Sequence, residues 1–293
     1  MMLKNFKKFT FRALFVGNIL VILLMLLVGN IDWLNPVDYP LLANLGLGYP
    51  ILLAFNFAFL VFWIFVRLRT IWLPVLGFIL CFASIRIYCP FNLPKDKPHG
   101  AIKVLSYNVY MFDSWEEINP KTNPIVNYII DSKADLVCLQ EAQGDGDKSG
   151  GIYERLKAHY PYFKLMVKKK PGADYMVLLS RYPILWQDTI PYGSSSNQSV
   201  AYMVDIKGTK TLVVNNHFES NGLSNDDKAG FKSLVKGSMQ TDKAKSESVH
   251  LLRKLGKVSM RRAPQADMVA RYVKQYLDKK VPVILCGDFN DNP

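Results

Sequence analysis

The segment VPVILCGDFN at residues 281–290 joins an apolar run to two polar side chains, Asp288 and Asn290. The run Val281–Cys286 is short, apolar and followed by Gly287, which is typical of a buried β-strand that ends in a turn. Side chains at the ends of buried strands are held by a rigid element and still reach water, so ligand sites in sheet proteins often lie there. We therefore expect Asp288 and Asn290 to belong to a functional site.

Three further apolar runs end in a polar side chain. These residues, each with its run, are Asn108 (101–109), Glu141 (135–140) and His217 (211–216). Taken singly, each has an ordinary explanation, because Asn favours turns, a Glu after a buried strand is commonly a surface residue, and a single His is commonly structural. The recurrence of the pattern favours one shared site.

Strands alternate with helices and hairpins after residue 100, which predicts a mixed α/β fold. The expected elements are strands at 101–109, 135–140, 176–180, 200–206, 211–216 and 281–286, and helices that begin at Pro124 and Pro264. Gly208 lies between two of the strands and predicts a hairpin, and Asn123 is a suitable helix cap. The Lys-rich segment 222–262 has little periodicity and is expected to be a long surface loop or a partly helical insertion.

The five polar side chains suit the hydrolysis of a phosphate ester, which needs charge neutralisation on the phosphoryl oxygens and a positioned water. Glu141 offers the carboxylate that Mg²⁺ or Mn²⁺ prefers. Asp288 would orient and deprotonate the water, and His217 would donate to a phosphoryl oxygen. Asn108 and Asn290 would donate to phosphate oxygens or hold Asp288. Four cysteines without a Cys-x-x-Cys pair argue against a structural zinc site.

Five stretches resemble the endonuclease/exonuclease/phosphatase (deoxyribonuclease I-like) family in their order and approximate spacing. They are Ser-Tyr-Asn-Val (106–109), Leu-Gln-Glu (139–141), Leu-Ser-Arg-Tyr-Pro-Ile (179–184), Asn-x-His (215–217) and Gly-Asp-Phe-Asn (287–290). The resemblance runs from about residue 102 to 290 and implies a four-layer α-β-β-α sandwich of two β-sheets between helices. It also implies Glu141 as the principal metal ligand, assisted by Asn108. Asp288 and Asn290 would act on the attacking water and the phosphate, with His217 as a phosphate contact.

The chain departs from the family pattern in two places. Some members carry an Asp two residues after the strand-end Asn, where this chain has Tyr110. The family also places a further Asp and then an Asp-His pair beyond Gly-Asp-x-Asn, whereas this sequence ends at Pro293. We expect the sequence to be a truncated piece whose 293-residue form is inactive. The alternative is a naturally short, inactive relative.

Residues 1–93 are expected to form a transmembrane region of two or three helices. Uncharged stretches of 19, 28 and 16 residues lie between the charged positions 12 and 32, 38 and 67, and 69 and 86. A membrane-spanning helix needs about 20 apolar residues, so the third stretch suffices only if Arg86 snorkels to the interface. The expected spans are 11–29, 42–66 and 71–89, followed by a linker at 94–100 that contains Pro94 and Pro98, and by the soluble domain at 101–293.

The Lys and Arg residues near the spans predict an orientation. Four basic residues precede the first span, the first loop has none, and the second loop carries Arg67 and Arg69. This places the N-terminus inside and the catalytic domain outside the cytoplasm. If the third stretch does not span, the domain lies in the cytoplasm instead.

The formal net charge is +12, and 29 Lys and Arg against 22 Asp and Glu from Lys95 onward give +7. This balance suits a phosphate-bearing or anionic partner, although a generally basic surface explains it as well. One function left open is a membrane-tethered phosphodiesterase or nuclease, with the basic residues between Lys228 and Arg262 along a nucleic-acid backbone. A second is hydrolysis of a phospholipid or sphingomyelin head group or of a small phosphate ester. A third is an inactive anchored domain that binds phosphate or a partner.

Overall fold

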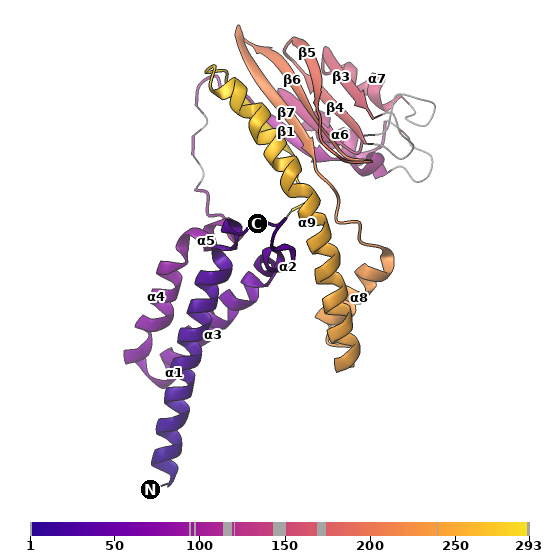
Figure 1. Cartoon of the computed structure of the whole chain (residues 1–293). Coiled ribbons are helices and arrows are strands. Elements are labelled where there is room, and N and C mark those ends of the chain that lie inside the picture. The colour runs from indigo at the N-terminus through magenta and orange to yellow at the C-terminus, as the bar shows by residue number, and fades with distance from the viewer. Residues whose placement is uncertain are drawn as a thin grey trace. The chain divides into compact units, whose positions relative to one another are not determined.

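The computed structural model describes residues 2–93, 95–96, 98–113, 119, 121–142, 151–168, 174–238 and 240–291. Pro94 of the expected linker and Pro293 lie outside the described residues. The chain forms two compact units (Figure 1). The first consists of Met1–Lys95, Leu223–Met260 and Asp291–Pro293, and the second of Asp96–Gly222 and Arg261–Asn290.

The N-terminal part of the first unit is helical. Its elements are α1 (Met2–Gly29), η1 (Ile31–Trp33), α2 (Pro40–Ala43), η2 (Asn44–Gly48), α3 (Tyr49–Val66), η3 (Leu68–Thr70), α4 (Trp72–Leu80) and α5 (Phe82–Tyr88). Two helical stretches, Phe6–Gly29 and Pro40–Val66, are long and apolar enough to cross a membrane. The third expected span is a pair of short helices, α4 and α5, bent by 65°.

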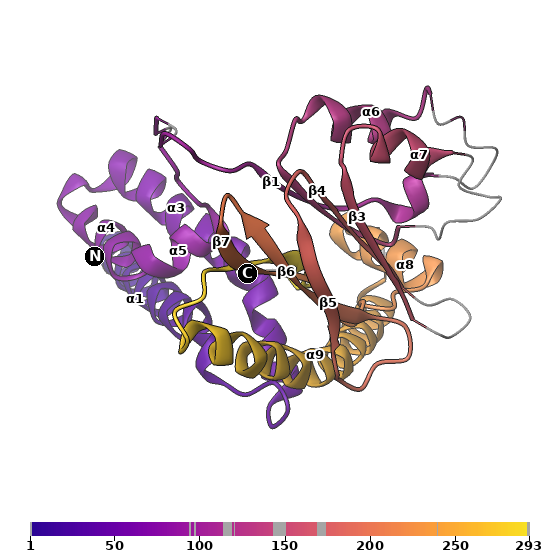
Figure 2. The same ribbon diagram turned by 90° about the horizontal axis from the view of Figure 1, so that it is seen from above.

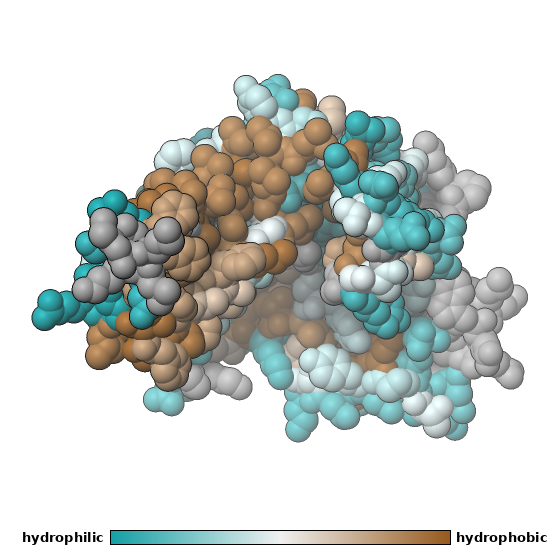
Figure 3. Space-filling view, turned by 90° about the horizontal axis from the view of Figure 1, so that it is seen from below, coloured by the Kyte–Doolittle hydropathy of each residue, from teal (hydrophilic) through white to brown (hydrophobic). Residues whose placement is uncertain are grey.

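Polar side chains join these helices on the inside, and apolar ones cover the outside. Asn18 donates to the Oδ1 atom of Asn56 at 3.1 Å, and Asn56 donates to the carbonyl of Pro74 at 3.0 Å. Trp63 completes the network through a 3.2 Å bond from its ring nitrogen to Asn18. Large apolar side chains on α1, α3 and α4 are exposed, and Figure 3 shows apolar surface gathered over this part of the molecule. This is the distribution expected of helices surrounded by lipid.

The second unit contains two four-stranded sheets of mixed direction. The first has the order β1-β2-β4-β3, and its strands are β1 (Val104–Asn108), β2 (Leu136–Gln140), β3 (Tyr162–Val167) and β4 (Tyr175–Ser180). The second has the order β5-β6-β7-β8, and its strands are β5 (Ile184–Ile190), β6 (Gln198–Ile206), β7 (Thr209–His217) and β8 (Val283–Asp288). β1 and β2 are parallel, as are β7 and β8, and the other neighbours are antiparallel. The six predicted strands and the hairpin at Gly208 are present, whereas β3 and β5 were not predicted.

Three apolar clusters separate four layers. The first lies between α6 (Pro124–Asp131), α7 (Ile152–Lys157) and the outer face of the first sheet. The second lies between the two sheets and includes Cys138 and Cys286, and the third lies between the second sheet and the C-terminal half of α9 (Thr241–Leu277). Figure 2 shows α6 and α7 on one side of the two sheets and α9 on the other. The predicted α-β-β-α arrangement is therefore confirmed.

Of the two alternatives predicted for residues 222–262, the partly helical one is confirmed and the surface loop is not, because α8 (Asn225–Val235) and the first half of α9 occupy most of this segment. The prediction for Pro264 was wrong. Pro264 does not begin a helix but lies inside α9. The prediction for Pro124 was correct, since Asn123 caps α6 by accepting hydrogen bonds from the backbone of Ile125 and Val126 at 3.0 Å each.

Candidate functional site

Two pairs of parallel strands bring the predicted residues to one edge of each sheet. In the first sheet Asn108 ends β1 and lies opposite Gln140, which ends β2 and is followed by Glu141. In the second sheet His217 ends β7 and lies opposite Asp288, which ends β8. Parallel strands have their carboxyl ends on the same side, so each sheet presents two of the predicted side chains together.

The side-chain amide of Asn108 joins the two sheet edges. Its Nδ2 atom donates to Oε1 of Glu141 at 2.9 Å and to Oδ2 of Asp288 at 3.0 Å. The distance between the two carboxylate oxygens therefore cannot exceed the sum of these two hydrogen-bond lengths. The Oδ1 atom of Asn108 accepts from the backbone of Tyr110 at 3.1 Å, which fixes the orientation of the amide. Asn108 is thus placed to hold Asp288 beside Glu141.

The backbone of Glu141 is strained and tied down on both sides. Its φ of 50° is left-handed, a conformation that costs a non-glycine residue about 1–2 kcal/mol. Its N–H donates to Oδ1 of Asp174 at 3.3 Å, and its carbonyl accepts from the backbone of Met111 at 2.8 Å. These contacts hold a conformation of a kind that clusters at functional sites. About a third of the side chain (32%) remains exposed.

His217 is buried and oriented by a carboxylate that the sequence analysis did not identify. Its Nδ1 atom lies 2.8 Å from Oδ2 of Asp174, and the two side chains are 4% and 2% exposed. Because an ionised carboxylate only accepts, Nδ1 is the donor. Nε2 lies 3.6 Å from Oε1 of Glu141 and has no hydrogen-bond partner among the described residues.

The charges around His217 favour its protonated form. Burial, the largest single influence, lowers the pKa of His217. The hydrogen bond to Asp174 and the negative charges of Asp174, Glu141 and Asp288 together outweigh burial, so that the pKa is raised above its ordinary value. A protonated ring has a hydrogen on Nε2 as well, which can be donated to an anion in the site.

The close pairing of β8 with β7 depends on Gly287, which lies within β8. The φ of Gly287 is 137°, and a Cβ atom there would lie 2.0 Å from the carbonyl oxygen of Asn216. Only glycine therefore lets β8 pair this closely with β7 beside the site. After the strand, the N–H of Asn290 donates to Oδ1 of Asp288 at 2.8 Å, and its side chain donates to the carbonyl of Phe218 at 2.9 Å.

Arg262 supports this turn from α9. It is only 5% exposed, and its guanidinium donates to the carbonyl of Asn290 and, at 2.8 Å, to Oδ1 of Asn221. The expectation that Arg262 belongs to a solvent-exposed basic loop along a nucleic-acid backbone was therefore wrong.

A buried hydrogen bond between amide side chains joins the sheets beneath the site. Gln140 donates to Oδ1 of Asn215 at 2.6 Å, and Asn215 donates to the carbonyl of Leu139 at 3.0 Å. Gln140 directly precedes Glu141, and Asn215 precedes His217 by two residues. The contact therefore fixes the relative position of the two strand ends that carry these side chains.

The donor set suits a magnesium-type cation better than zinc. No group of three or more His, Cys, Asp or Glu side chains in the described part of the chain is arranged to hold a metal ion. Two carboxylates, Glu141 and Asp288, lie together with part of their surface open, and Mg²⁺ commonly binds one or two carboxylates and keeps several waters. The nitrogen of Asn108, not its oxygen, faces these carboxylates. Its predicted role as a metal ligand would require the amide to turn over.

The local sequence does not reveal the roles of Asp174 and Arg262 in the site, for two physical reasons. Asp174 precedes β4, and because β4 runs antiparallel to β2, its start lies beside the end of β2. Asp174 therefore does not follow an apolar run, as the predicted site residues do. Arg262 lies in a Lys-rich stretch that hides its periodicity, yet Arg262, Gln265 and Val269 are buried at helical spacing on α9.

Comparisons with known proteins agree with this fold. Residues 105–293 match the model of the Endonuclease/Exonuclease/phosphatase family, and residues 11–88 match a domain of unknown function (DUF8431). No curated protein matches the chain.

Several solved structures resemble the chain at low sequence identity. Truncated TDP2 from Caenorhabditis elegans is 15% identical over 65% of this chain and 63% of its own, with a TM-score of 0.43. A beta-hairpin deletion mutant of beta toxin from Staphylococcus aureus is 20% identical over 66% of this chain and 68% of its own, with a TM-score of 0.43. The human Nocturnin catalytic domain is 17% identical over 68% of this chain and 67% of its own, with a TM-score of 0.45. The chain spans somewhat less than two thirds of the TDP2 structure.

The family match covers more than half of the sequence and includes all five of the predicted site residues. The chain belongs to the endonuclease/exonuclease/phosphatase family.

Proposed function

We propose that this protein is a membrane-anchored phosphodiesterase that depends on Mg²⁺ or Mn²⁺. The observation that carries the proposal is the pair of hydrogen bonds from Asn108 to Glu141 and Asp288, which joins a carboxylate of one sheet to a carboxylate of the other. Two carboxylates kept this close repel each other, and the neutral amide of Asn108 that lies between them does not cancel their charge. A site of this kind favours a hydrated divalent cation and an anionic substrate.

Each side chain has a distinct task in this proposal. The bound cation would neutralise charge on the phosphoryl oxygens and lower the pKa of a water. Glu141 would hold the cation, and Asp288, kept in place by Asn108 and by the backbone of Asn290, would orient the water and accept its proton. His217, oriented by Asp174, would donate from Nε2 to a phosphoryl oxygen.

The N-terminal helices supply the membrane attachment. Two of them have the length and apolar composition of spans, and the bent pair α4–α5 would be the third. Three spans, with the basic residues at the N-terminus inside, place the catalytic domain outside the cytoplasm. Protease protection in sealed vesicles of known orientation tests this topology, because a cytoplasmic domain would be cleaved from the opposite side.

The enzymatic proposal is tested with the full-length protein and bis(p-nitrophenyl) phosphate, in Mg²⁺ or Mn²⁺ and in a chelator. Glu141→Gln and Asp288→Asn are each expected to reduce turnover by about 10²–10³-fold, the usual effect of losing a group that stabilises developing charge. Asp267→Asn, an exposed carboxylate on α9, is the matched control and is expected to behave as wild type. Turnover that is independent of metal, or undiminished in the two site variants, would remove the proposal.

A further inference from the structure

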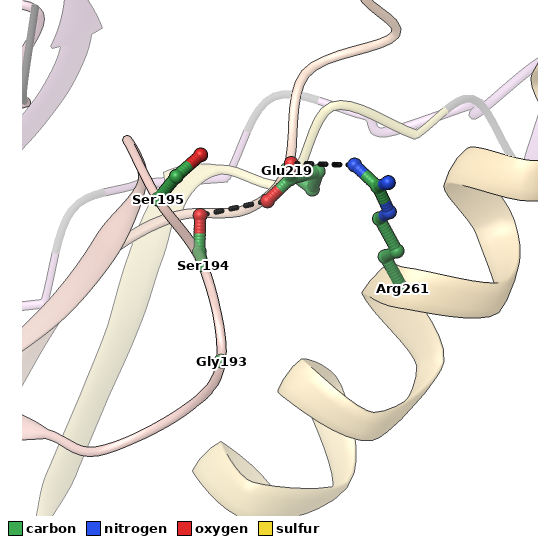
Figure 4. Close-up of a pocket in the computed structure, with 5 residues that line it drawn as sticks. All are labelled: Gly193, Ser194, Ser195, Glu219 and Arg261. Carbon is green, nitrogen blue, oxygen red and sulfur yellow. Dashed lines mark hydrogen bonds and ion pairs between the residues drawn. The ribbon is translucent and has the colours of Figure 1, made fainter.

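A polar pocket lies near the proposed site. It has a volume of about 310 Å³ and is lined by residues from the loop after β5, from the segment after β7 and from α9 (Figure 4). The lining residues are Gly193, Ser194, Ser195, Glu219 and Arg261. Glu219 follows His217 by two residues, so their Cα atoms are at most about 7 Å apart. A group bound in this pocket would therefore be close enough to belong to the substrate of the neighbouring site.

Glu219 is fixed at the base of the pocket. Its side chain is 12% exposed, and its Oε2 atom accepts from the hydroxyl of Ser194 at 2.7 Å and from Gln265 at 3.4 Å. Among the described residues, its Oε1 atom has the 3.4 Å contact with Arg261 as its single side-chain partner, and its N–H donates to Oε1 of Gln265 at 2.9 Å. Figure 4 shows Ser194 and Arg261 directed at Glu219 from opposite sides. The carboxylate is thus held in place and keeps accepting capacity on Oε1.

Donors are also available at the rim. Arg261 is 69% exposed and contacts Glu219 through one of its five N–H groups, at a long distance. Ser195, which follows Ser194, is exposed and adds a hydroxyl, which is both donor and acceptor. The pocket therefore presents an acceptor, several donors and a hydroxyl within a small space.

This lining selects among ligand classes by charge. Arg261 would attract an anion and Glu219 would repel it. A cation would be attracted by Glu219 and repelled by Arg261. The paired charges of Arg261 and Glu219 favour an uncharged ligand. A ligand with several hydroxyl groups matches the mixture of donors and acceptors in the pocket, because each hydroxyl both donates and accepts. None of the described residues that line the pocket has an aromatic or aliphatic side chain, so these residues offer no apolar surface to a nucleobase or an acyl chain. The volume suits one small ring or chain, because pockets for larger ligands reach about 1,000 Å³.

We propose that this pocket binds the hydroxyl-bearing alcohol, a sugar or a polyol, that is esterified to the phosphate cleaved at the neighbouring site. The assignment rests on the proposed phosphodiesterase function. A ribose of RNA and an inositol or glycerol head group share this chemistry, whereas choline and an internal deoxyribose of DNA lack free hydroxyls.

The test compares p-nitrophenyl phosphodiesters that differ only in the second alcohol: uridine through its 5′-oxygen, myo-inositol, and choline. The full-length protein is expected to hydrolyse at least one of the hydroxylated esters about tenfold better than the choline ester, as one or two additional hydrogen bonds provide. Preference for the uridine ester would indicate RNA-like substrates, and preference for the inositol ester would indicate a lipid head group or a soluble inositol phosphate. A choline ester hydrolysed as well as both others would overturn the assignment.

Two variants and a control separate the pocket from the catalytic site. Arg261→Gln and Ser195→Ala are each expected to lower kcat/KM for the preferred ester by several-fold to tenfold and to leave bis(p-nitrophenyl) phosphate hydrolysis unchanged. Arg271→Gln removes an equivalent exposed charge from the same helix and is expected to change neither activity. Equal losses on all substrates would contradict the assignment.

Binding gives a readout that does not need turnover. Saturation-transfer NMR with ribose 5-phosphate, myo-inositol 1-phosphate and phosphocholine is expected to show stronger transfer to a hydroxylated ligand, and this difference should disappear in Arg261→Gln. If the protein hydrolyses no ester but retains this difference, the proposed catalysis fails, and only the recognition of hydroxyl groups by the pocket stands. If binding shows no difference between the ligands, the pocket assignment fails.

Discussion

The buried hydrogen bond between Gln140 and Asn215 makes a quantitative prediction about how the sheets are held together. Replacing Asn215 with Leu keeps the approximate shape but removes a 2.6 Å bond between side chains that are 1% and 0% exposed. The bond itself contributes about 0.5–1.5 kcal/mol, and the Gln140 amide and the Leu139 carbonyl lose their short contacts in a place that water cannot reach. Since each poorly satisfied buried group costs about 1–3 kcal/mol, and Gln140 retains long contacts to Ser106 and Cys138, we expect a total loss of about 2–4 kcal/mol.

A double-mutant cycle makes this prediction specific. Gln140→Met alone leaves the Oδ1 atom of Asn215 without its donor, while Nδ2 keeps its bonds to the carbonyls of Leu139 and Val177. In the double variant Gln140→Met/Asn215→Leu both partners are apolar, and neither side-chain amide is left unsatisfied. The double variant should therefore be less destabilised than the sum of the single variants, by about 1–3 kcal/mol. As a control, Asn216→Leu alters a neighbouring buried amide that bonds to Ser199 and Cys286 within its own sheet, so its effect should add to that of Gln140→Met.

Hydrogen–deuterium exchange of the β2 and β7 peptides measures the effect in the full-length protein, because amide protection in these strands reports the free energy of opening. Additivity of Gln140→Met and Asn215→Leu within about 0.5 kcal/mol would refute the reasoning, since residues that interact do not add. The same result would mean that the strand ends are held in place by apolar packing alone.

Three further substitutions test other parts of the structure. Asp174→Asn replaces one of the two acceptor oxygens of Asp174 with a donor, so the His217 ring should lose its orientation. Turnover of a phosphodiester should fall by about 10²-fold, while hydrogen–deuterium exchange of β7 stays near wild type. Unchanged turnover would show that the ring needs no support from Asp174. Gly287→Ala places a Cβ atom 2.0 Å from the Asn216 backbone and should speed exchange in β8 by more than tenfold, and protection as in wild type would contradict the steric argument. Asn56→Leu removes the link between Asn18 and Pro74 and should lower the stability of the N-terminal helices in detergent by about 0.6–1.7 kcal/mol, which thermal unfolding would detect; no change would indicate that packing alone holds these helices.

The sequence predicted the features that follow from local periodicity. The apolar runs before Asn108, Glu141 and Asp288 are strands, as predicted from their short length, their apolar residues and the polar residues that end them. β5 was not predicted because exposed residues interrupt its apolar pattern. Its register with β6 also shifts between Ile184 and Trp186. A strand could therefore be predicted where its apolar residues form an uninterrupted local pattern, and β5 could not because its pattern is interrupted.

Features that depend on long-range pairing could not be predicted in this way. Asp174 acts through its position at the start of an antiparallel strand, and nothing local distinguishes it from an ordinary surface Asp. The interior position of Pro264 in α9 also runs against local preference, since proline usually begins or ends a helix. Packing of Val269 and Val273 against the second sheet favours continuation of the helix through this point.

The arrangement of the strands explains why one edge of the sandwich carries all of these side chains. Each sheet contains one parallel pair of strands. The two strands of a parallel pair end on the same side of the sheet, so the residues that follow them lie together there. The antiparallel neighbours β4 and β6 begin at this edge and deliver Asp174 and Gln198 to it. The bond between Asn108 and Asp288 joins residues 180 positions apart, so the chain must first close a long loop before this contact can form. Apolar packing between the sheets, to which Cys138 and Cys286 belong, therefore supports the site together with the buried bond between Gln140 and Asn215.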